Sequence, residues 1–291
     1  MTPPARPDVV ETIAAVRQRV ADARGAGQSI GLVPTMGALH EGHLSLIRRA
    51  RERTGCVVVS IFVNPTQFVA GEDLDSYPRT LEADVDACGR IGADLVFAPS
   101  VEVMYRPDAV TTVRVSGLTE TLCGPHRPGH FEGVTTVVSK LFNIVQPDVA
   151  FFGQKDAQQA IVLRKMVEDL DMPIEVEVCP TVREPDGLAM SSRNAYLSAE
   201  QRQQAVSLYR ALDGARQAIA DGQRDATTLI ARMRETLQSA GPCRIDYVDI
   251  VHPTTLEPVD PVTCPVLIAL AVRIGRSRLI DNIVVDPATP G

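Results

Sequence analysis

The chain has 291 residues, of which 45% are hydrophobic and 22% charged, so its composition is that of a globular protein with room for one large domain or two smaller ones. Its formal net charge of −7 argues against nucleic acid as the main partner, because nucleic-acid binding usually requires a basic surface. No apolar stretch is long enough to cross a bilayer and no apolar signal core follows the N-terminus, so we expect a cytoplasmic protein. The six cysteines form no Cys-x-x-Cys pair, so we expect neither disulfides nor a cysteine-based zinc site.

Helical and extended patterns alternate over the first 180 residues. Apolar spacing from Val9 to Val20 predicts a helix that ends near Gly25. Apolar runs then predict strands, and periodic patterns between them predict helices; the strands are expected at 30–33, 56–63, 95–98, 149–152 and 174–178, and the helices at about 42–53, 80–91, 132–145 and 156–169. This alternation indicates an α/β fold, a Rossmann-like parallel sheet with helices on both faces. Ligands of such sheets bind beyond the carboxyl ends of the strands, so we expect the loops there to form one site.

The pattern changes after Leu197. Ser198 and Gln201 have the spacing of a capping box and predict a helix to about residue 220, followed by a second helix at about 225–239. Three extended stretches follow, at 245–251, 266–272 and 279–285. Two helices followed by strands predict a smaller C-terminal α+β domain. We place the boundary so that residues 1–183 form the larger domain and residues 184–291 the smaller one.

The most informative segment, Pro34 to His43, reads PTMGALHEGH and joins a strand to a helix. Backbone N–H groups at a helix start attract anions, and the helix dipole adds to that attraction. His40 and His43 lie three residues apart, so both can point at the same group. Imidazole can donate to phosphate oxygens and, when protonated, can stabilise departing pyrophosphate. Metal binding by this pair is disfavoured, because zinc requires a third protein ligand and the spacing His-Glu-x-x-His is absent.

Two further segments carry groups suited to phosphate. Lys155 can reach a phosphate as a point charge, and Gln159, about one turn later, can orient a hydroxyl or a carboxylate. The alternative for this segment is a solvated lysine that precedes a helix cap at Asp156. Residues 191–193, Ser-Ser-Arg, supply two hydroxyl donors and a guanidinium fork in a loop that can close over a triphosphate. The alternative there is an ordinary polar turn that caps a helix.

Three isolated side chains complete the inventory. Gln67 offers an amide beside aromatic surface, and Arg127 is a candidate for binding carboxylate or phosphate. Asp84 is a candidate ligand for the magnesium ion that accompanies a nucleoside triphosphate, although a solvated helix face explains it equally well. The chain contains neither a P-loop nor a G-x-G-x-x-G motif, and Ser191 and Ser192 adjoin an arginine rather than a base, so no protein nucleophile is indicated.

Taken together, these segments resemble the pantothenate synthetase (pantoate–β-alanine ligase) family. The resemblance runs in order from residue 30 to about residue 197 through PTMGALHEGH, FVNPTQF, YPRT, RPGHFEGV, FFGQKDAQQ and DGLAMSSRN. His-x-Gly-His and the Met-Ser-Ser-Arg loop also look like the HIGH and KMSKS pair of class I aminoacyl-tRNA synthetases, a wider nucleotidyl-transfer superfamily. Residues 199–291 fit the family's small C-terminal domain but carry weaker motifs.

The resemblance implies an ATP-dependent ligase of coenzyme A precursor biosynthesis that works in two steps. The pantoate carboxylate attacks the α-phosphate of ATP to give pantoyl adenylate and pyrophosphate, and the amine of β-alanine then displaces AMP to give pantothenate. Because the substrate itself attacks, the protein is expected to supply positioning and charge stabilisation. The implied partners are these small molecules and Mg2+, with no nucleic acid and no membrane, and the implied assembly is a homodimer.

The family's site residues carry over as three sets. The catalytic set, in which His43 is favoured as the proton carrier, comprises His40, His43, Lys155, Ser191, Ser192 and Arg193. ATP binding adds Pro34, Met36, Gly153, Asp156, Val182 and Met190. The substrate-binding set, in which the two glutamines grip the hydroxyl and carboxylate groups of pantoate and Arg127 lies near the carboxylate of the incoming amine, comprises Pro34, Met36, Phe62, Asn64, Gln67, Arg127 and Gln159. Asp84 is the implied magnesium ligand, while Ala87 stands where some relatives carry a polar side chain.

Two alternatives compete with this interpretation. Another adenylyltransferase of the superfamily would couple ATP to a different acid, but Gln67 and Gln159 suit a hydroxylated acid better than a phosphorylated one. A non-catalytic nucleotide- or RNA-binding module is disfavoured by the acidic net charge and by the complete set of phosphate-binding side chains. Residues 69–80, which contain three acidic side chains, are further predicted to form a flap that orders when substrate binds.

Overall fold

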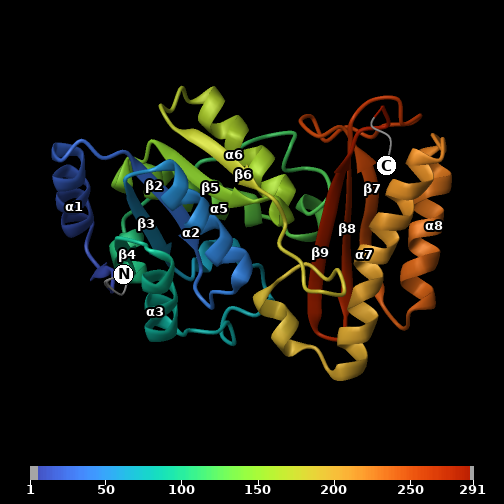
Figure 1. Cartoon of the computed structure of the whole chain (residues 1–291), viewed down its shortest axis with the longest axis horizontal. Helices are drawn as coiled ribbons and strands as arrows, with labels where there is room; N and C mark the ends of the chain where they lie inside the picture. The colour runs from blue at the N-terminus through green and yellow to red at the C-terminus, as the bar shows by residue number, and fades with distance from the viewer. Residues whose placement is uncertain (1–5, 289–291) are drawn as a thin grey trace. The chain divides into compact units, whose positions relative to one another are not determined.

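The computed structural model describes residues 6–288, which form two compact units (Figure 1). The first unit contains the chain up to Ser116 together with 127–153 and 162–180, and the second contains 117–126, 154–161 and the chain from Thr181 onward. Two short segments of the second unit therefore come from the range expected to form the larger domain. The division into domains 1–183 and 184–291, whose outermost residues lie outside the described range, stays a prediction.

The first unit is built on a six-stranded sheet with strand order β1-β4-β3-β2-β5-β6, in which every pair of neighbours is parallel. The strands are β1 (Asp8–Val10), β2 (Ile30–Thr35), β3 (Cys56–Ile61), β4 (Leu95–Phe97), β5 (Val149–Gly153) and β6 (Glu175–Cys179). β2 lies between β3 and β5, so the strand order reverses at its carboxyl end. This is where ligands bind in sheets of this type, and the segment Pro34–His43 begins there.

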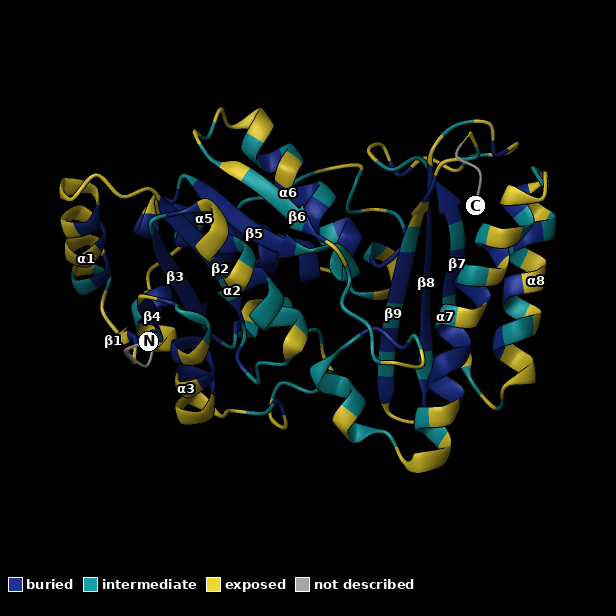
Figure 2. Cartoon of the chain, viewed as in Figure 1, coloured by how far each residue is buried: buried dark blue, intermediate teal, exposed yellow. Residues whose placement is uncertain are grey.

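Helices cover both faces of this sheet, as expected for a parallel sheet whose inner strands β2, β3, β4 and β5 are buried nearly throughout (Figure 2). The helices of the unit are α1 (Ile13–Gly25), α2 (Glu41–Arg53), α3 (Leu81–Ile91), α4 (Val101–Met104), α5 (His130–Val145) and the part of α6 (Ala157–Asp169) from Val162 on. Alternate side chains of β3 point to opposite faces: Val58 packs in one apolar cluster with Val16 and Phe142, whereas Val57 packs in another with Ile47. The α/β fold class expected from the sequence is confirmed.

The N-terminal segment differs from its prediction. Residues 8–10 form an edge strand that pairs with residues 95–97, so the placement of Val9 in the first helix was wrong. The helix begins only at Ile13, because Thr12 caps it: its backbone is extended and its hydroxyl accepts the N–H of Ala15 at 3.2 Å. Val9, which precedes this cap, therefore belongs to the sheet rather than to the apolar face of the helix.

The second unit contains an antiparallel sheet of β7 (Arg244–Val251), β8 (Val266–Ile274) and β9 (Ser277–Val285). Its two long helices are α7 (Ala199–Ala220) and α8 (Ala226–Ser239), and the predicted capping box between Ser198 and Gln201 is present at the start of α7. Leu212, Leu229 and Ile268 share an apolar core between these helices and one face of the sheet. The expected α+β architecture is confirmed.

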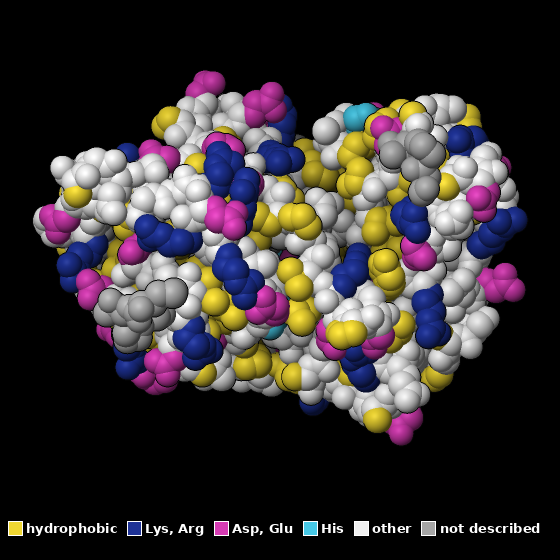
Figure 3. All heavy atoms as spheres, viewed as in Figure 1, with side chains coloured by type: hydrophobic (Ala, Val, Ile, Leu, Met, Phe, Trp, Pro, Cys, Tyr) yellow, Lys and Arg dark blue, Asp and Glu magenta, His cyan; other side chains and the backbone are white. Residues whose placement is uncertain are grey.

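Charge is mixed rather than segregated on the surface. In the face shown in Figure 3, acidic and basic side chains are interspersed. Many of the arginines are paired, for example Arg48 with Glu41 and Arg53 with Glu177, both at 2.6 Å. Across residues 6–288, no helix combines the length and the apolar character that crossing a bilayer demands.

Candidate active site

The loop after β2 turns sharply before it enters α2. Thr35 ends the strand, and its hydroxyl donates to the carbonyl of Ser60 at 2.8 Å and accepts the N–H of Gly37 at 3.2 Å. Gly37 and Ala38 both have positive φ, +81° and +51°, so the chain passes through two consecutive left-handed residues. The turn delivers His40 as the N-cap of α2.

The two histidines of this turn cap the helix reciprocally. Nδ1 of His40 accepts the N–H of Gly42 at 3.2 Å, and Nδ1 of His43 accepts the N–H of His40 at 3.3 Å. The ring centroids are 4.1 Å apart. Since Nδ1 is the acceptor in both rings, each neutral imidazole carries its proton on Nε2 and is a hydrogen-bond donor at that atom. Both rings thereby carry an N–H donor of the kind that can bond a phosphate oxygen.

The backbone N–H groups around this helix start do not play the role expected of them. Those of His40 and Gly42 are taken by the histidine rings, and those of Ala38 and Leu39 bind the carboxylate of Asp84. These four amide groups are satisfied within the protein, so they are not the groups that would bind an external anion.

The surroundings of Asp84 do not fit a protein-held magnesium ion. Asp84 is 3% exposed, and its two oxygens accept three hydrogen bonds, from the N–H groups of Ala38 and Leu39 and from the hydroxyl of Thr80. The positive ends of these donors point at the oxygens that an ion would need. The side chain of Ala87 offers no oxygen, and the described part of the chain contains no group of three His, Cys, Asp or Glu side chains that could hold a metal.

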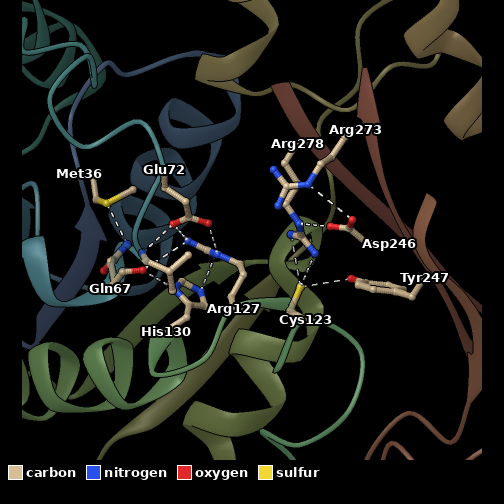
Figure 4. Close-up of polar contacts among 11 residues, drawn as sticks. Met36, Gln67, Glu72, Cys123, Arg127, His130, Asp246, Tyr247, Arg273 and Arg278 are labelled. Carbon is tan, nitrogen blue, oxygen red and sulfur yellow. Dashed lines mark hydrogen bonds and ion pairs between the residues drawn. The ribbon is translucent and has the colours of Figure 1, made fainter. Parts of the chain in front are cut away.

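Several of the residues expected to bind pantoate contact one another within the first unit (Figure 4). Nε2 of Gln67 lies 2.9 Å from Sδ of Met36, and Oε1 of Gln67 accepts from Asn64 at 3.2 Å. Asn64 is almost fully buried, and it also accepts the hydroxyl of Tyr105 at 2.8 Å. Phe62 is buried beside that tyrosine, with ring centroids 6.2 Å apart. Gln67 thus contacts Met36 and is tied to the buried Asn64.

Arg127 forms an ion pair with the carboxylate of Glu72 (Figure 4). Two parallel bonds join them, Nε to Oε1 at 2.6 Å and Nη2 to Oε2 at 2.7 Å. Nη1 of Arg127 lies 2.8 Å from Nε2 of His130, whose Nδ1 is 2.7 Å from the backbone oxygen of Gln67. Because arginine can only donate, the proton of the neutral ring sits on Nδ1 and bonds that oxygen. Neither Glu72 nor His130 was among the predicted site residues, although His130 stands in the recognised motif RPGHFEGV and Glu72 in the segment 69–80 predicted to form a flap.

Replacing Glu72 with glutamine is expected to lower the free energy of unfolding by about 2 kcal/mol at pH 7, because Arg127 loses a nearly buried ionic partner. Burial raises the pKa of Glu72, but the bonds and charge of Arg127 outweigh burial and leave that pKa below its ordinary 4.5. A lowered folded-state pKa stabilises the protein above the unfolded-state pKa, and this contribution is lost as the pH falls through the folded-state value. Urea unfolding from pH 7 to pH 3 should show wild type and E72Q converging at the acid end.

Asp75→Asn is the matched control, since Asp75 is an exposed carboxylate of the same segment. A pH-independent difference between E72Q and wild type, or an equal loss in D75N, would contradict the assignment of this stabilisation to the pair of Glu72 and Arg127.

In the second unit, Lys155 lies in the short helix η3 (Gln154–Asp156), which β9 holds in place. Nδ2 of Asn282 donates to the carbonyl groups of Gln154 and Lys155, both at 2.9 Å, and Oδ1 of Asn282 accepts from Gln154 at 2.9 Å. Asn282 is 4% exposed, and Nζ of Lys155 lies 3.7 Å from Asp156. Asn282 therefore positions the backbone that carries Lys155. Its signal in the sequence is a polar pair, Asp281 and Asn282, between the apolar residues 279–280 and 283–285 of the strand.

Asn282→Ala is expected to reduce turnover about tenfold and to lower stability by about 1–3 kcal/mol, because the carbonyl groups of Gln154 and Lys155 lose their buried donor. Turnover measured at saturating substrate, together with urea unfolding, tests both parts. Val284→Ala, at a half-exposed position of the same strand, should change neither. Full turnover in N282A would exclude a positioning role for this side chain.

Residues 182–190 of the second unit form a hairpin-like loop just before the Ser-Ser-Arg loop. The N–H of Met190 bonds the carbonyl of Val182 at 3.0 Å, so these two predicted ATP-binding residues lie side by side. Arg183 pairs with the buried Asp281 at 2.6 Å, and burial raises the pKa of that carboxyl despite the arginine. The turn is thereby anchored to β9.

The Ser-Ser-Arg loop itself opens the short helix η4 (Ser192–Tyr196). The hydroxyl of Ser191 caps it by accepting the N–H of Arg193 at 3.3 Å. Asn194 ties it down by donating to Glu184 at 3.0 Å and to the carbonyl of Ala189 at 3.1 Å. Ser191 therefore caps a helix, which was the alternative considered for this loop.

A further polar cluster of the second unit fixes residues 117–126 against β7 and β9 (Figure 4). Sγ of the buried Cys123 lies 3.3 Å from the hydroxyl of Tyr247 and 3.6 Å from both terminal nitrogens of Arg278. Arg278 also pairs with Asp246 at 2.8 Å. Burial, with the neighbouring Cys123, raises the pKa of Tyr247 well above its usual value. These groups satisfy one another and join residues 117–126 to the sheet of the second unit.

The structure thus brings the predicted residues together in parts. In the first unit His40 joins His43, and Met36, Asn64 and Gln67 join one another. In the second unit Lys155 adjoins Asp156, and Val182 adjoins Met190. The roles assigned to all of these residues, and the expectation that both units serve one ligand, stay predictions.

A Rossmann-like sheet with a His-x-Gly-His turn at its strand-order reversal defines a class of nucleotide-binding α/β protein. Within this class, a family model described as pantoate-beta-alanine ligase matches residues 8–284. The chain belongs to this family, and it is therefore an enzyme of the ligase class.

Individual relatives support this assignment over nearly their whole length. Pantothenate synthetase of Moorella thermoacetica is 57% identical, with 96% of this chain and 99% of the relative covered. A crystal structure of pantothenate synthetase from Thermus thermophilus superposes with a TM-score of 0.91 at 47% identity, covering 95% of this chain and 98% of the other. Pantoate-beta-alanine ligase from Francisella tularensis, solved in complex with beta-gamma ATP and beta-alanine, gives a TM-score of 0.79 at 32% identity, covering 98% of this chain and all of the other.

Proposed function

We propose that the chain condenses pantoate with β-alanine at the expense of ATP, through a pantoyl-adenylate intermediate, and releases AMP and pyrophosphate. Membership of the pantoate–β-alanine ligase family supports the overall product, pantothenate. The complex of the Francisella tularensis relative with beta-gamma ATP and beta-alanine supports ATP as a substrate. The observation that carries the proposal is the pair of histidine rings at the strand-order reversal, both fixed as Nε2 donors.

In the first step, oxygen of the pantoate carboxylate forms a bond to the α-phosphorus of ATP while the bond to the bridging oxygen of pyrophosphate breaks. Negative charge grows on the departing pyrophosphate, and the Nε2–H groups of His40 and His43 donate hydrogen bonds to it. Lys155 and the loop residues Ser191, Ser192 and Arg193 supply further positive charge and donors. Gln67 and Gln159 orient pantoate, so that catalysis consists of positioning and charge stabilisation.

In the second step, the amine of β-alanine attacks the acyl carbon, and AMP leaves with the electrons of the acyl–oxygen bond. Arg127 is proposed to bind the β-alanine carboxylate, for which it would exchange its present partner Glu72. Magnesium is proposed to enter with the phosphates of ATP, because Mg2+ in nucleotide sites is bound largely through phosphate oxygens and water. We further propose a cytoplasmic homodimer that binds small molecules and neither nucleic acid nor membrane.

Pyrophosphate release tests the proposal. With ATP, magnesium and pantoate but no amine, we expect a burst of about one pyrophosphate per active site, and with β-alanine we expect continuous release matched by AMP. Pantolactone, which lacks the free carboxylate, should give no release. Release that does not depend on pantoate would indicate a different adenylyltransferase, and no release with any acid would indicate a non-catalytic nucleotide-binding module.

A further inference from the structure

Asp84 occupies an anion-binding hollow formed by the protein's own backbone. The carboxylate, at the first turn of α3, is 3% exposed. Its Oδ1 accepts the N–H of Leu39 at 2.8 Å, and its Oδ2 accepts the N–H of Ala38 at 3.0 Å. The hydroxyl of Thr80, the residue before α3, donates to Oδ2 at 3.1 Å and completes the set.

The conformation of the turn explains why two successive N–H groups point at one carboxylate. Gly37 and Ala38 are both left-handed, and residues of this kind turn neighbouring N–H groups toward a common anion. Ala38 adopts positive φ without being glycine, a conformation that persists only where surrounding contacts hold it. A Cβ on Gly37 would lie 3.0 Å from Oδ2 of Asp84 and 3.1 Å from Cγ2 of Ile61, so the carboxylate is packed directly against the turn.

We propose that Asp84 is a positioning residue: its carboxylate is the internal anion that fixes the Gly37–Leu39 turn and so sets the place of His40 and His43. The same contacts argue against a role as a magnesium ligand, because both oxygens already accept N–H or O–H donors from the protein. The consequence for the histidines rests on the proposed function, whereas the fixing of the turn does not.

Amide hydrogen exchange in nucleotide-free protein with EDTA tests the positioning directly. In Asp84→Asn the side chain keeps its shape but replaces one acceptor with an NH2 group, which would face an N–H. We expect exchange at Ala38 and Leu39 to be at least about tenfold faster in D84N while the rest of the sheet stays protected. Thr80→Val, which removes only one donor to Oδ2, should give a smaller acceleration at the same amides. Asp86→Asn, an exposed carboxylate of the same helix, is the matched control and should leave them unchanged.

Magnesium titration of pyrophosphate release gives the second readout. A positioning residue predicts that D84N lowers maximal release about tenfold or more, with the magnesium concentration at half-saturation within about twofold of wild type. A metal ligand predicts the reverse, a half-saturating concentration raised about tenfold with unchanged exchange at Ala38 and Leu39, and that result would overturn the inference. Should D84N fail to fold, Thr80→Val carries the test: wild-type exchange at both amides in T80V would refute the anchor. Exchange is measured without substrates, so failure of the proposed reaction would be seen separately in the wild-type assay.

Discussion

His43→Ala is expected to slow pantoate-dependent pyrophosphate release by at least ~100-fold, the low end for removing one preorganised donor from a developing oxyanion. Under the proposed mechanism His43 has two separable functions, because Nδ1 accepts the N–H of His40 while Nε2 carries the donor proton. Alanine removes both. Single-turnover release of pyrophosphate measures the chemical step, and urea unfolding measures the cost of the lost helix cap, expected at about 1 kcal/mol.

Two further replacements of His43 separate these functions. Asparagine places an acceptor near the position of Nδ1 but none of its atoms reaches that of Nε2, so H43N should recover most of the stability and little of the activity. Glutamine can place an N–H donor near the position of Nε2 but lacks the capping acceptor, so H43Q should recover part of the activity at reduced stability. Equal activity in H43N and wild type would show that the ring acts only as a cap.

Much of the fold could be predicted from the sequence because most of its strands are buried on both faces. Such strands read as continuous apolar runs, and the boundaries expected for β2, β4 and β5 lie within two residues of those found. β1 could not be predicted in this way. It is a three-residue edge strand defined by its pairing with β4, and no local pattern reports a pairing between segments so far apart.

The types of residue that form the site could be predicted from the sequence, but the residues that they contact could not. The motif at His40 and His43 identified the donors, because helix start, spacing and side-chain chemistry are all local. The partner of the Ala38 amide is Asp84, 46 residues away, and that of the Lys155 carbonyl is Asn282, 127 residues away. An aspartate in sequence reads equally well as a metal ligand, a solvated side chain or an internal anion. Only the position of its oxygens beside N–H groups distinguishes these uses, and that position depends on the folded sheet.

The second large effect is expected from Gly133→Ala, at the first turns of α5. The turn that carries Gln67 approaches the helix so closely here that an added Cβ would lie 2.6 Å from the carbonyl carbon of Thr66, 2.8 Å from the Gln67 nitrogen and closer still to the Thr66 oxygen. These are backbone atoms, which no rotamer change can move aside. We expect a loss of about 1–3 kcal/mol in stability from overpacking. We also expect a fall of up to ~100-fold in kcat/KM for pantoate, the scale of a 1 Å displacement of a positioning group.

Because the displaced groups are proposed to orient pantoate, the effect should fall on that substrate rather than on ATP. Asn64 donates to the carbonyl of Gly133 at 3.2 Å and to Gln67, so retreat of the turn disturbs both contacts together. Gly25→Ala in the same unit is the control: nothing lies within 4 Å of the added Cβ, and the change should leave kinetics alone and stability equal or slightly higher. A G133A variant that loses stability yet keeps the wild-type KM and kcat for pantoate would separate this turn from substrate binding and remove Gln67 from its proposed role.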